Sequence, residues 1–403
     1  MNLAKQYNLI CNGNIILFIL FLHHILYKPA FTVVLISSVF LAIWGRRLKK
    51  LELTICQGKE EASFWRINLI FVASLIIASC FSSSFKQSMY MALEYIYWWL
   101  PYLVMLVFLR QEDDFKSAYV GLALAGIFVS SYAIYQRYIL DIVRPPGFYP
   151  NPNSLAACIE LLLPALLLGW NYYAPKMKRL PQIFLALCII STLWGLLVTE
   201  SRGAILGLAI AFALYIMIFE RSNKALIKKY LIFSVGILGI VFLVLPNLFY
   251  RMIGIDFDNL NADMGRRLVM QSSLAMWQDH KLWGIGLGNF QEAYETKYVL
   301  PEARERHLGT AHNTILQYLA ESGIFSALLY IVMMGWHLYY MYKQAPDNLW
   351  CRIMFITILV LNIHSLADAL YTVKPVNRMY WCLMGITVAF IRYKKAVVRQ
   401  NAA

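Results

Sequence analysis

Long apolar runs alternate with short polar segments along the whole chain. Backbone N–H and C=O groups inside lipid must be satisfied within their own segment, so apolar runs of roughly 17 to 25 residues predict membrane-spanning helices. The pattern predicts an all-α integral membrane protein with about 12 transmembrane helices, forming a single polytopic domain over residues 1–403. The predicted spans lie near residues 9–26, 29–45, 66–83, 89–109, 117–138, 152–170, 182–199, 203–219, 230–249, 323–341, 352–370 and 377–392.

The composition supports this class and excludes others. Hydrophobic residues make up 60% of the chain and charged residues only 14%, whereas a soluble globular protein carries about 25% charged residues. These values exclude a soluble enzyme, a disordered chain and, despite the net charge of +14, a nucleic-acid binder. The seven cysteines are scattered, without a C-x-x-C pair, so we expect them to pack as small hydrophobic residues.

The distribution of Lys and Arg predicts which way the helices face. Positive charge in short loops is retained on the cytoplasmic side of a membrane. If both termini are cytoplasmic, most of the 36 Lys and Arg residues fall on that side, including clusters at 46–50 and 392–399. This orientation requires the first two apolar runs to form separate helices, because one long helix there would reverse every later loop.

A long outer segment, residues 250–322, separates the ninth and tenth predicted helices. Within it, residues 264–283 repeat apolar positions at helical spacing, and a glycine-rich stretch follows at 284–290. We therefore expect an outer lid that contains an amphipathic helix lying on the membrane surface. The residues on its apolar face are Leu268, Ser272, Ala275, Met276 and Trp283.

Cationic residues gather on the outer side, where the positive-inside rule discourages them. They come from four separate loops, which indicates an anionic lipid or a phosphate ligand. Arg202 could instead extend to the interface without a ligand, because it follows an apolar helix. Arg266 and Arg267 begin the amphipathic helix, where free N–H groups favour an anion, and periodicity does not decide which of them points inward. The group comprises Arg144, Arg202, Arg266, Arg267, Arg304, Arg306, Lys374 and Arg378.

Two histidines are candidates for chemistry or its support. His312, followed by Asn313, lies at the outer end of the tenth helix, and a neutral imidazole there could accept a proton from a hydroxyl group. A capping or interfacial histidine is the alternative. His364 and Asp368 are four residues apart in the eleventh span and would share a helix face. They could support the arginine cluster or form a structural contact between helices.

Two other motifs are weak evidence for a metal site or a nucleotide site. Asp256 and Asp258 form a D-x-D pair, which some transferases use to hold a metal, but the residues that follow lack the pattern of a calcium loop. Gly284, Gly286 and Gly288 lack the lysine of a P-loop and do not follow a strand. We therefore expect no metal and no cofactor.

Several short motifs, taken in their order and spacing, resemble the bacterial O-antigen ligase and O-antigen polymerase family of membrane glycosyltransferases. The resemblance covers most of the chain. One departure is Met270, where an aromatic residue is often expected after the arginine. The motifs are the stretch from Arg144 to Asn153, Ser201-Arg202-Gly203, Arg266 followed by Trp277 and by 279–290, and Ala311-His312-Asn313 leading to 319–323.

The resemblance implies a fold of the GT-C type in the bacterial inner membrane and a periplasmic active site. It implies a donor glycan linked to undecaprenyl diphosphate, whose diphosphate is held by arginines. A histidine in the long loop would activate the acceptor hydroxyl without a metal. The matching positions are Arg202, Arg266 and His312, with Arg144, Arg267, Asn313, Arg304, Arg306, Lys374 and Arg378 as further expected substrate contacts.

The motifs leave the acceptor open. A ligase would use the lipid A core oligosaccharide, a polymerase a second lipid-linked repeat, and a protein oligosaccharyltransferase a protein hydroxyl. The modest length and the single outer loop of about 70 residues favour the ligase. A transporter of a lipid-linked anionic glycan is the alternative from another class, and it would distribute charges along a path through the membrane.

Overall fold

Every regular element in the described part of the chain is a helix. The computed structural model describes residues 3–22, 28–47, 57–225 and 257–402, with scattered positions between 227 and 248. The predicted ninth span and Asp256 lie outside the continuous ranges. The helices are α1 (Leu3–Leu22), α2 (Lys28–Arg47), α3 (Gly58–Cys80), α4 (Phe85–Trp98), α5 (Leu100–Phe108), α6 (Glu112–Tyr138), α7 (Pro152–Tyr173), η1 (Ala174–Lys176), α8 (Arg179–Val198), α9 (Arg202–Phe219), α12 (Phe257–Asp279), α13 (Phe290–Ala293), η2 (Tyr294–Tyr298), α14 (Thr314–Gln344), α15 (Leu349–His364), η3 (Leu370–Thr372) and α16 (Lys374–Ala402).

Seven helical stretches among the described residues are long and apolar enough to cross a membrane, counting α4 with α5 and α7 with η1. Three shorter apolar helices lie within α1, α2 and α15. The all-helical membrane class is therefore confirmed, while the count of twelve spans stays a prediction. The first two apolar runs form separate helices, α1 and α2, as the predicted orientation requires.

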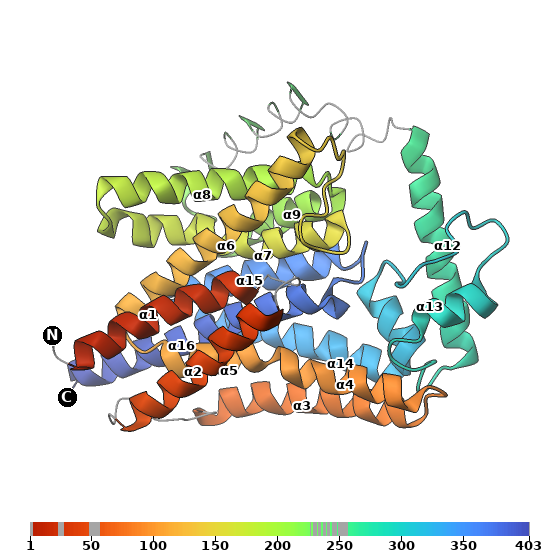
Figure 1. Ribbon diagram of the computed structural model, residues 1–403, viewed down its shortest axis with the longest axis horizontal. Helices are drawn as coiled ribbons and strands as arrows, with labels where there is room; N and C mark the ends of the chain where they lie inside the picture. Colours follow the sequence, from red (N-terminus) through yellow and green to blue (C-terminus); the bar gives the residue numbers. More distant parts are fainter. Residues whose placement is uncertain are drawn as a thin grey trace.

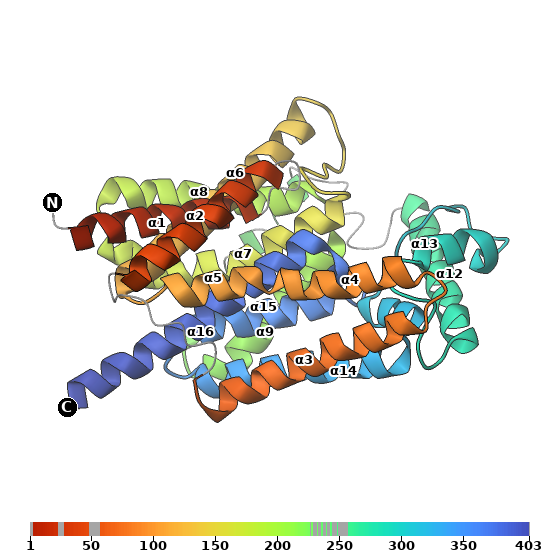
Figure 2. The ribbon, with the colours of Figure 1, turned by 60° about the horizontal axis from the view of Figure 1, so that its bottom comes forward.

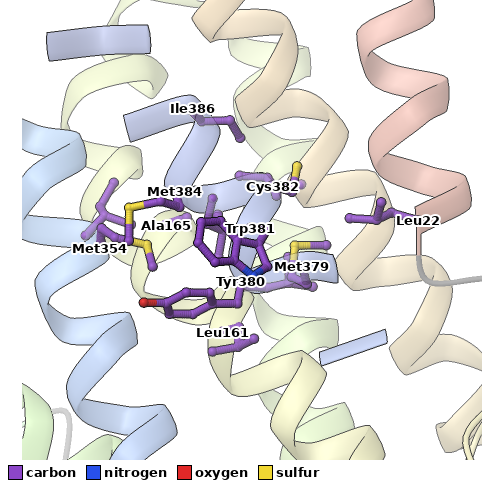
Figure 3. Packing of buried hydrophobic residues seen from close by; sticks show 14 of the residues in the cluster. Leu22, Leu161, Ala165, Met354, Met379, Tyr380, Trp381, Cys382, Met384 and Ile386 are labelled. Carbon is purple, nitrogen blue, oxygen red and sulfur yellow. The ribbon is translucent and has the colours of Figure 1, made fainter. Parts of the chain in front are cut away.

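Helix α16 forms the centre of the bundle. All residues from Met379 to Ile391 are buried, as expected for a helix that contacts other helices on every side. Its Trp381 and Cys382 lie near Leu161 of α7 and Leu22 of α1 in the core (Figure 3). Both faces of α16 are thus occupied by protein, which explains why this helix tolerates few polar residues along its middle.

The two termini lie at one end of the bundle, and α12 and α13 lie at the other (Figures 1 and 2). Helix α12 runs across the ends of the bundle helices (Figure 1). Its buried positions Val269 and Met276 join a small core with Phe290 and Tyr294. The amphipathic pattern of this region thus reflects packing on protein, and the helix begins at Phe257, earlier than the expected 264.

The glycine-rich stretch after α12 is hydrogen-bonded to α14 near a kink in that helix. The N–H groups of Ile285 and Gly286 donate to the carbonyls of Ala320 and Glu321, each at 2.9 Å, and Ile324 donates to Lys281 at 3.0 Å. The kink is at Gly323, whose φ of 76° favours glycine. Helix α14 therefore begins nine residues before the predicted span, and its first turns belong to the same end of the bundle as α12.

We predict that Gly323→Ala destabilises the protein. An added Cβ would lie 2.0 Å from the carbonyl oxygen of Leu282, and a left-handed backbone costs a non-glycine residue roughly 1–2 kcal/mol. The melting temperature in detergent should therefore fall. Gly335→Ala in the same helix is the matched control, because an added Cβ there meets open space. Equal melting temperatures for the two variants would contradict the role of the kink.

Candidate functional site

A small pocket lies where the α6–α7 loop, the α8–α9 turn, α12 and the end of α15 meet. Three of the predicted arginines, Arg144, Arg202 and Arg266, line it, and each is half-buried. The sequence placed these residues on one side of the membrane, and the fold brings them to one pocket. The other lining residues are Asn153, Glu200, Ser201, Gly203, His364 and Ala367.

Two of the arginines are positioned by the elements that carry them. Arg144 is held by hydrogen bonds from its Nε to the carbonyl of Thr199 at 3.1 Å and from its Nη2 to Asn153 Oδ1 at 3.0 Å. Arg202 is the first residue of α9, and the preceding Ser201 makes no side-chain cap hydrogen bond. The first turn of α9 therefore presents backbone N–H groups and the positive end of the helix dipole at the pocket.

The two adjacent arginines of α12 differ in their exposure to the pocket. Arg266 lines the pocket, whereas Arg267 is exposed. The expectation that these two residues begin a helix is wrong, because α12 begins at Phe257 and both arginines lie well inside it. Arg266 therefore contributes its side-chain charge without a helix N-terminus of its own.

Two residues at the site have an unusual backbone conformation. Glu200, which lines the pocket, has φ of 52°, and His312 has φ of 50°. Such left-handed non-glycine residues cost of order 1–3 kcal/mol each and concentrate at functional sites. The side chain of Glu200 is 1% exposed and forms an ion pair with Arg137 at 3.2 Å. The carboxylate is thereby offset by a cation from α6.

His312 lies two residues before α14 and contacts Asp368. Its Nδ1 lies 3.3 Å from Asp368 Oδ1, and Asp368 Oδ2 accepts a hydrogen bond from Asn153 Nδ2 at 2.9 Å. Because an ionised carboxylate only accepts hydrogen bonds, this contact assigns a proton to Nδ1 of His312. Asn153 also accepts from Arg144, so four side chains form one continuous chain from the pocket to the histidine.

The expected position of Asp368 on a helix face shared with His364 is wrong. Helix α15 ends at His364, and Asp368 lies in the following turn, where its N–H donates to the His364 carbonyl at 3.1 Å. Burial would raise the pKa of Asp368, but the hydrogen bond and charge of His312, with the charge of His364 and the hydrogen bond from Asn153, lower it to about 2. The carboxylate is therefore ionised at neutral pH.

His364 has a partner that sequence reasoning missed. Its Nδ1 lies 3.0 Å from both carboxylate oxygens of Glu160 in α7, and its Nε2 lies 3.4 Å from Ser201 Oγ. Both Glu160 and His364 are buried. A carboxylate within the otherwise apolar run 152–170 was the available signal, because an ionisable group there is costly unless it is paired.

The remaining predicted contacts lie outside the pocket, and their role in binding substrate stays a prediction. Asn313 caps α14 by accepting hydrogen bonds from the N–H groups of Ile315 and Leu316. Among the cations, Lys374 pairs with Glu94 at 2.7 Å, Arg378 lies over the ring of Tyr97, and Arg304 and Arg306 are exposed. Within the described ranges, no three His, Cys, Asp or Glu side chains converge to hold a metal ion.

Comparison with known proteins identifies one segment of the chain. Residues 184–331 match the family model described as O-antigen ligase. This segment contains Arg202, Arg266 and His312, the three positions singled out by the motifs. No curated protein sequence matches the chain. The match confirms the resemblance to the O-antigen ligase and polymerase family.

We predict that Asp368 makes stability depend on pH. Its pKa is lowered in the folded state to about 2, below the ordinary value of about 3.9. The carboxylate therefore stabilises the fold above pH ~4, by about 2 kcal/mol, and this contribution is lost as pH falls toward 2. Melting curves should show Asp368→Asn to be less stable than the wild type at pH 6, with the difference shrinking toward pH 3.

The matched control for this pH dependence is Asp113→Asn, which changes an exposed carboxylate in the first turn of α6. It should change the melting temperature little at either pH. A difference between wild type and Asp368→Asn that stays constant from pH 6 to pH 3 would show that the carboxylate charge is not what stabilises this turn.

Proposed function

We propose that this chain is an O-antigen ligase, because residues 184–331 match the family model described as O-antigen ligase. The donor is a glycan linked to undecaprenyl diphosphate, and the acceptor is a sugar hydroxyl of the lipid A core oligosaccharide. The observation that carries the proposal is the convergence of Arg144, Arg202 and Arg266 on one pocket. His312 is joined to that pocket through Asp368, Asn153 and Arg144.

The arginines would hold the diphosphate of the donor. As the bond from the sugar to the diphosphate breaks, negative charge develops on the leaving oxygen. Fixed guanidinium groups and the N-terminal turn of α9 stabilise that charge without having to reorganise, because Arg144 is already hydrogen-bonded in place. These cations can supply the role that a divalent metal has in other transferases, so we propose that the reaction is metal-independent.

His312 would act as the general base. With Nδ1 donating to Asp368, Nε2 can accept the proton of the acceptor hydroxyl. The acceptor oxygen then forms a bond to the anomeric carbon as the bond to the diphosphate breaks on the opposite side. The anomeric configuration is inverted, the proton remains on His312, and the electron pair leaves with the diphosphate.

The placement in the membrane follows from the positive-inside rule. Helix α12, whose Arg266 lines the pocket, lies at the end of the bundle opposite the two termini (Figure 1). With cytoplasmic termini, the pocket opens at the periplasmic face of the inner membrane. We propose a single polytopic domain of the GT-C type with about 12 spans, in which residues 250–322 form a periplasmic lid over the pocket.

The acceptor assignment rests on the length of the chain and on its remaining cations. The outer loop of about 70 residues is modest. Lys374 begins α16 at the outer end, and Arg378 lies one turn further along. They would contact phosphate groups of the lipid A core, for which their positive charge is suited. A polymerase or a protein oligosaccharyltransferase would share the donor pocket and differ in the acceptor.

We predict that Arg202→Ala, Arg266→Ala and His312→Ala each lower glycan transfer by roughly 10²–10³-fold, the usual loss when one charge-stabilising group is removed. The rate should be measured on purified protein of normal melting temperature. Arg221→Ala is the control, because it removes the charge of an exposed arginine that does not line the pocket. Transfer near the wild-type rate by all three site variants would refute the assignment.

We predict which acceptor the enzyme uses in a reconstituted assay. Purified protein receives undecaprenyl diphosphate-linked glycan, EDTA, and either lipid A core or a second lipid-linked repeat. Glycan attached to lipid A core in the presence of EDTA is the expected result. Longer lipid-linked glycan would instead identify a polymerase, a requirement for added metal would contradict the metal-independent mechanism, and no product with either acceptor would favour a protein acceptor or a transporter.

A further inference from the structure

His364 faces the same pocket as the three arginines, although it comes from a different element. It is the last residue of α15, it is 2% exposed, and it lines the pocket beside Arg202 and Arg266. The ring lies between Glu160, which contacts Nδ1, and Ser201, which lies nearest Nε2. One edge of the imidazole thus points into the bundle and the other toward the pocket.

The charge state of His364 follows from its partner. Glu160 is completely buried, and a carboxylate excluded from water requires a cation or several hydrogen bonds. Both of its oxygens lie 3.0 Å from Nδ1 of His364. Burial and the charge of Arg266 across the pocket oppose a protonated ring, whereas Asp368, in the turn after α15, favours it. Glu160 is in direct contact with the ring, and this contact favours the imidazolium form.

The glycine after Arg202 makes room for this ring. A Cβ added to Gly203 would lie 2.5 Å from Cδ2 of His364, closer than non-bonded atoms approach. The imidazole therefore packs directly against the first turn of α9. This contact brings a cationic ring next to the backbone N–H groups that open toward the pocket.

We propose that His364 is a fourth cationic group at the diphosphate site and that it acts through Ser201, whose hydroxyl binds the phosphate. The imidazolium Nε2–H donates to Ser201 Oγ, so the serine hydroxyl directs its own proton toward a phosphate oxygen. Glu160 is then a positioning residue that keeps the ring charged and oriented. This inference rests on the proposed function, because it assigns a further ligand to the same pocket.

The experiment measures binding of undecaprenyl diphosphate, without glycan, to the purified full-length protein in detergent. His364→Gln should weaken binding about tenfold at pH 7.5, as expected when one charge-assisted hydrogen bond is lost. His307→Gln is the matched control, because this histidine is exposed and pairs with Glu295 in the outer segment. It should bind as the wild type does. Melting curves establish that each variant is folded.

A second variant separates a charge effect from a packing effect. In Glu160→Gln the ring loses its contacting carboxylate, while burial and Arg266 disfavour its charged form, so the ring should be neutral at pH 7.5 and gain its proton only as the pH is lowered. Binding by Glu160→Gln should be about tenfold weaker than that of the wild type at pH 7.5 and should recover as the pH falls, while the ratio for His364→Gln changes little with pH. A loss of packing alone would weaken Glu160→Gln equally at every pH, and that result would overturn the proposal.

The outcomes distinguish failure of this inference from failure of the proposed function. Wild-type binding by His364→Gln, together with weakened binding by Arg266→Ala, would overturn the inference and leave the diphosphate pocket standing. Wild-type binding by both Arg202→Ala and Arg266→Ala would refute the pocket itself. A covalent sugar adduct on Ser201 after incubation with donor would show that His364 acts as a neutral base toward a nucleophilic serine, which would also overturn the inference.

Discussion

Arg144, Arg202 and Arg266 line one pocket at the end of an apolar bundle, and holding their charges there beside buried acids is the constraint on which this end of the protein depends. Each of the nearby acids has a specific partner: Glu200 pairs with Arg137, Glu160 with His364, and Asp368 with His312. The acids of this region are therefore held by specific contacts around the pocket.

Backbone geometry keeps this arrangement in place. The arginine on α12 reaches the pocket only because the segment that follows α12 is fastened to the kinked start of α14. The same segment is hydrogen-bonded to the first turn of α4, where Gln87 and Ser88 donate to the carbonyls of Gly288 and Leu287. Helices far apart in sequence therefore set the position of one charge, in the way that rigid supporting elements set the geometry of active sites.

The sequence was sufficient for the features that depend on local composition. Hydropathy predicted helices, and the positive charge on the predicted outer side gave a group of eight cations, of which the structure brings Arg144, Arg202 and Arg266 to one pocket. The predictions that were wrong depend on where helices begin and end. Arg266 could be told from Arg267 only once the orientation of α12 was known, and Asp368 left the helix because α15 stops at His364.

Glu160 was missed for a different reason. A single acid in a long apolar run has no local pattern around it, and its significance lies in a partner 204 positions away. The same holds for Asn153, whose side chain contacts both Arg144 and Asp368. Asp368 lies far from α7 in the sequence, so the spacing of these residues does not predict the contact. Local composition cannot reveal contacts that only the packing of distant helices creates.

The oxygen and the nitrogen of the Asn153 side-chain amide have partners of opposite charge. Its oxygen accepts from a cation and its nitrogen donates to an anion, so it joins Arg144 to Asp368 in series while carrying no charge itself. In the proposed reaction these two ends serve different substrates, since the arginine holds the donor and the aspartate orients the base for the acceptor. The amide therefore connects the donor and acceptor sides of the proposed site through hydrogen bonds. It does so without placing a further charge in a region where each ionised side chain needs a partner.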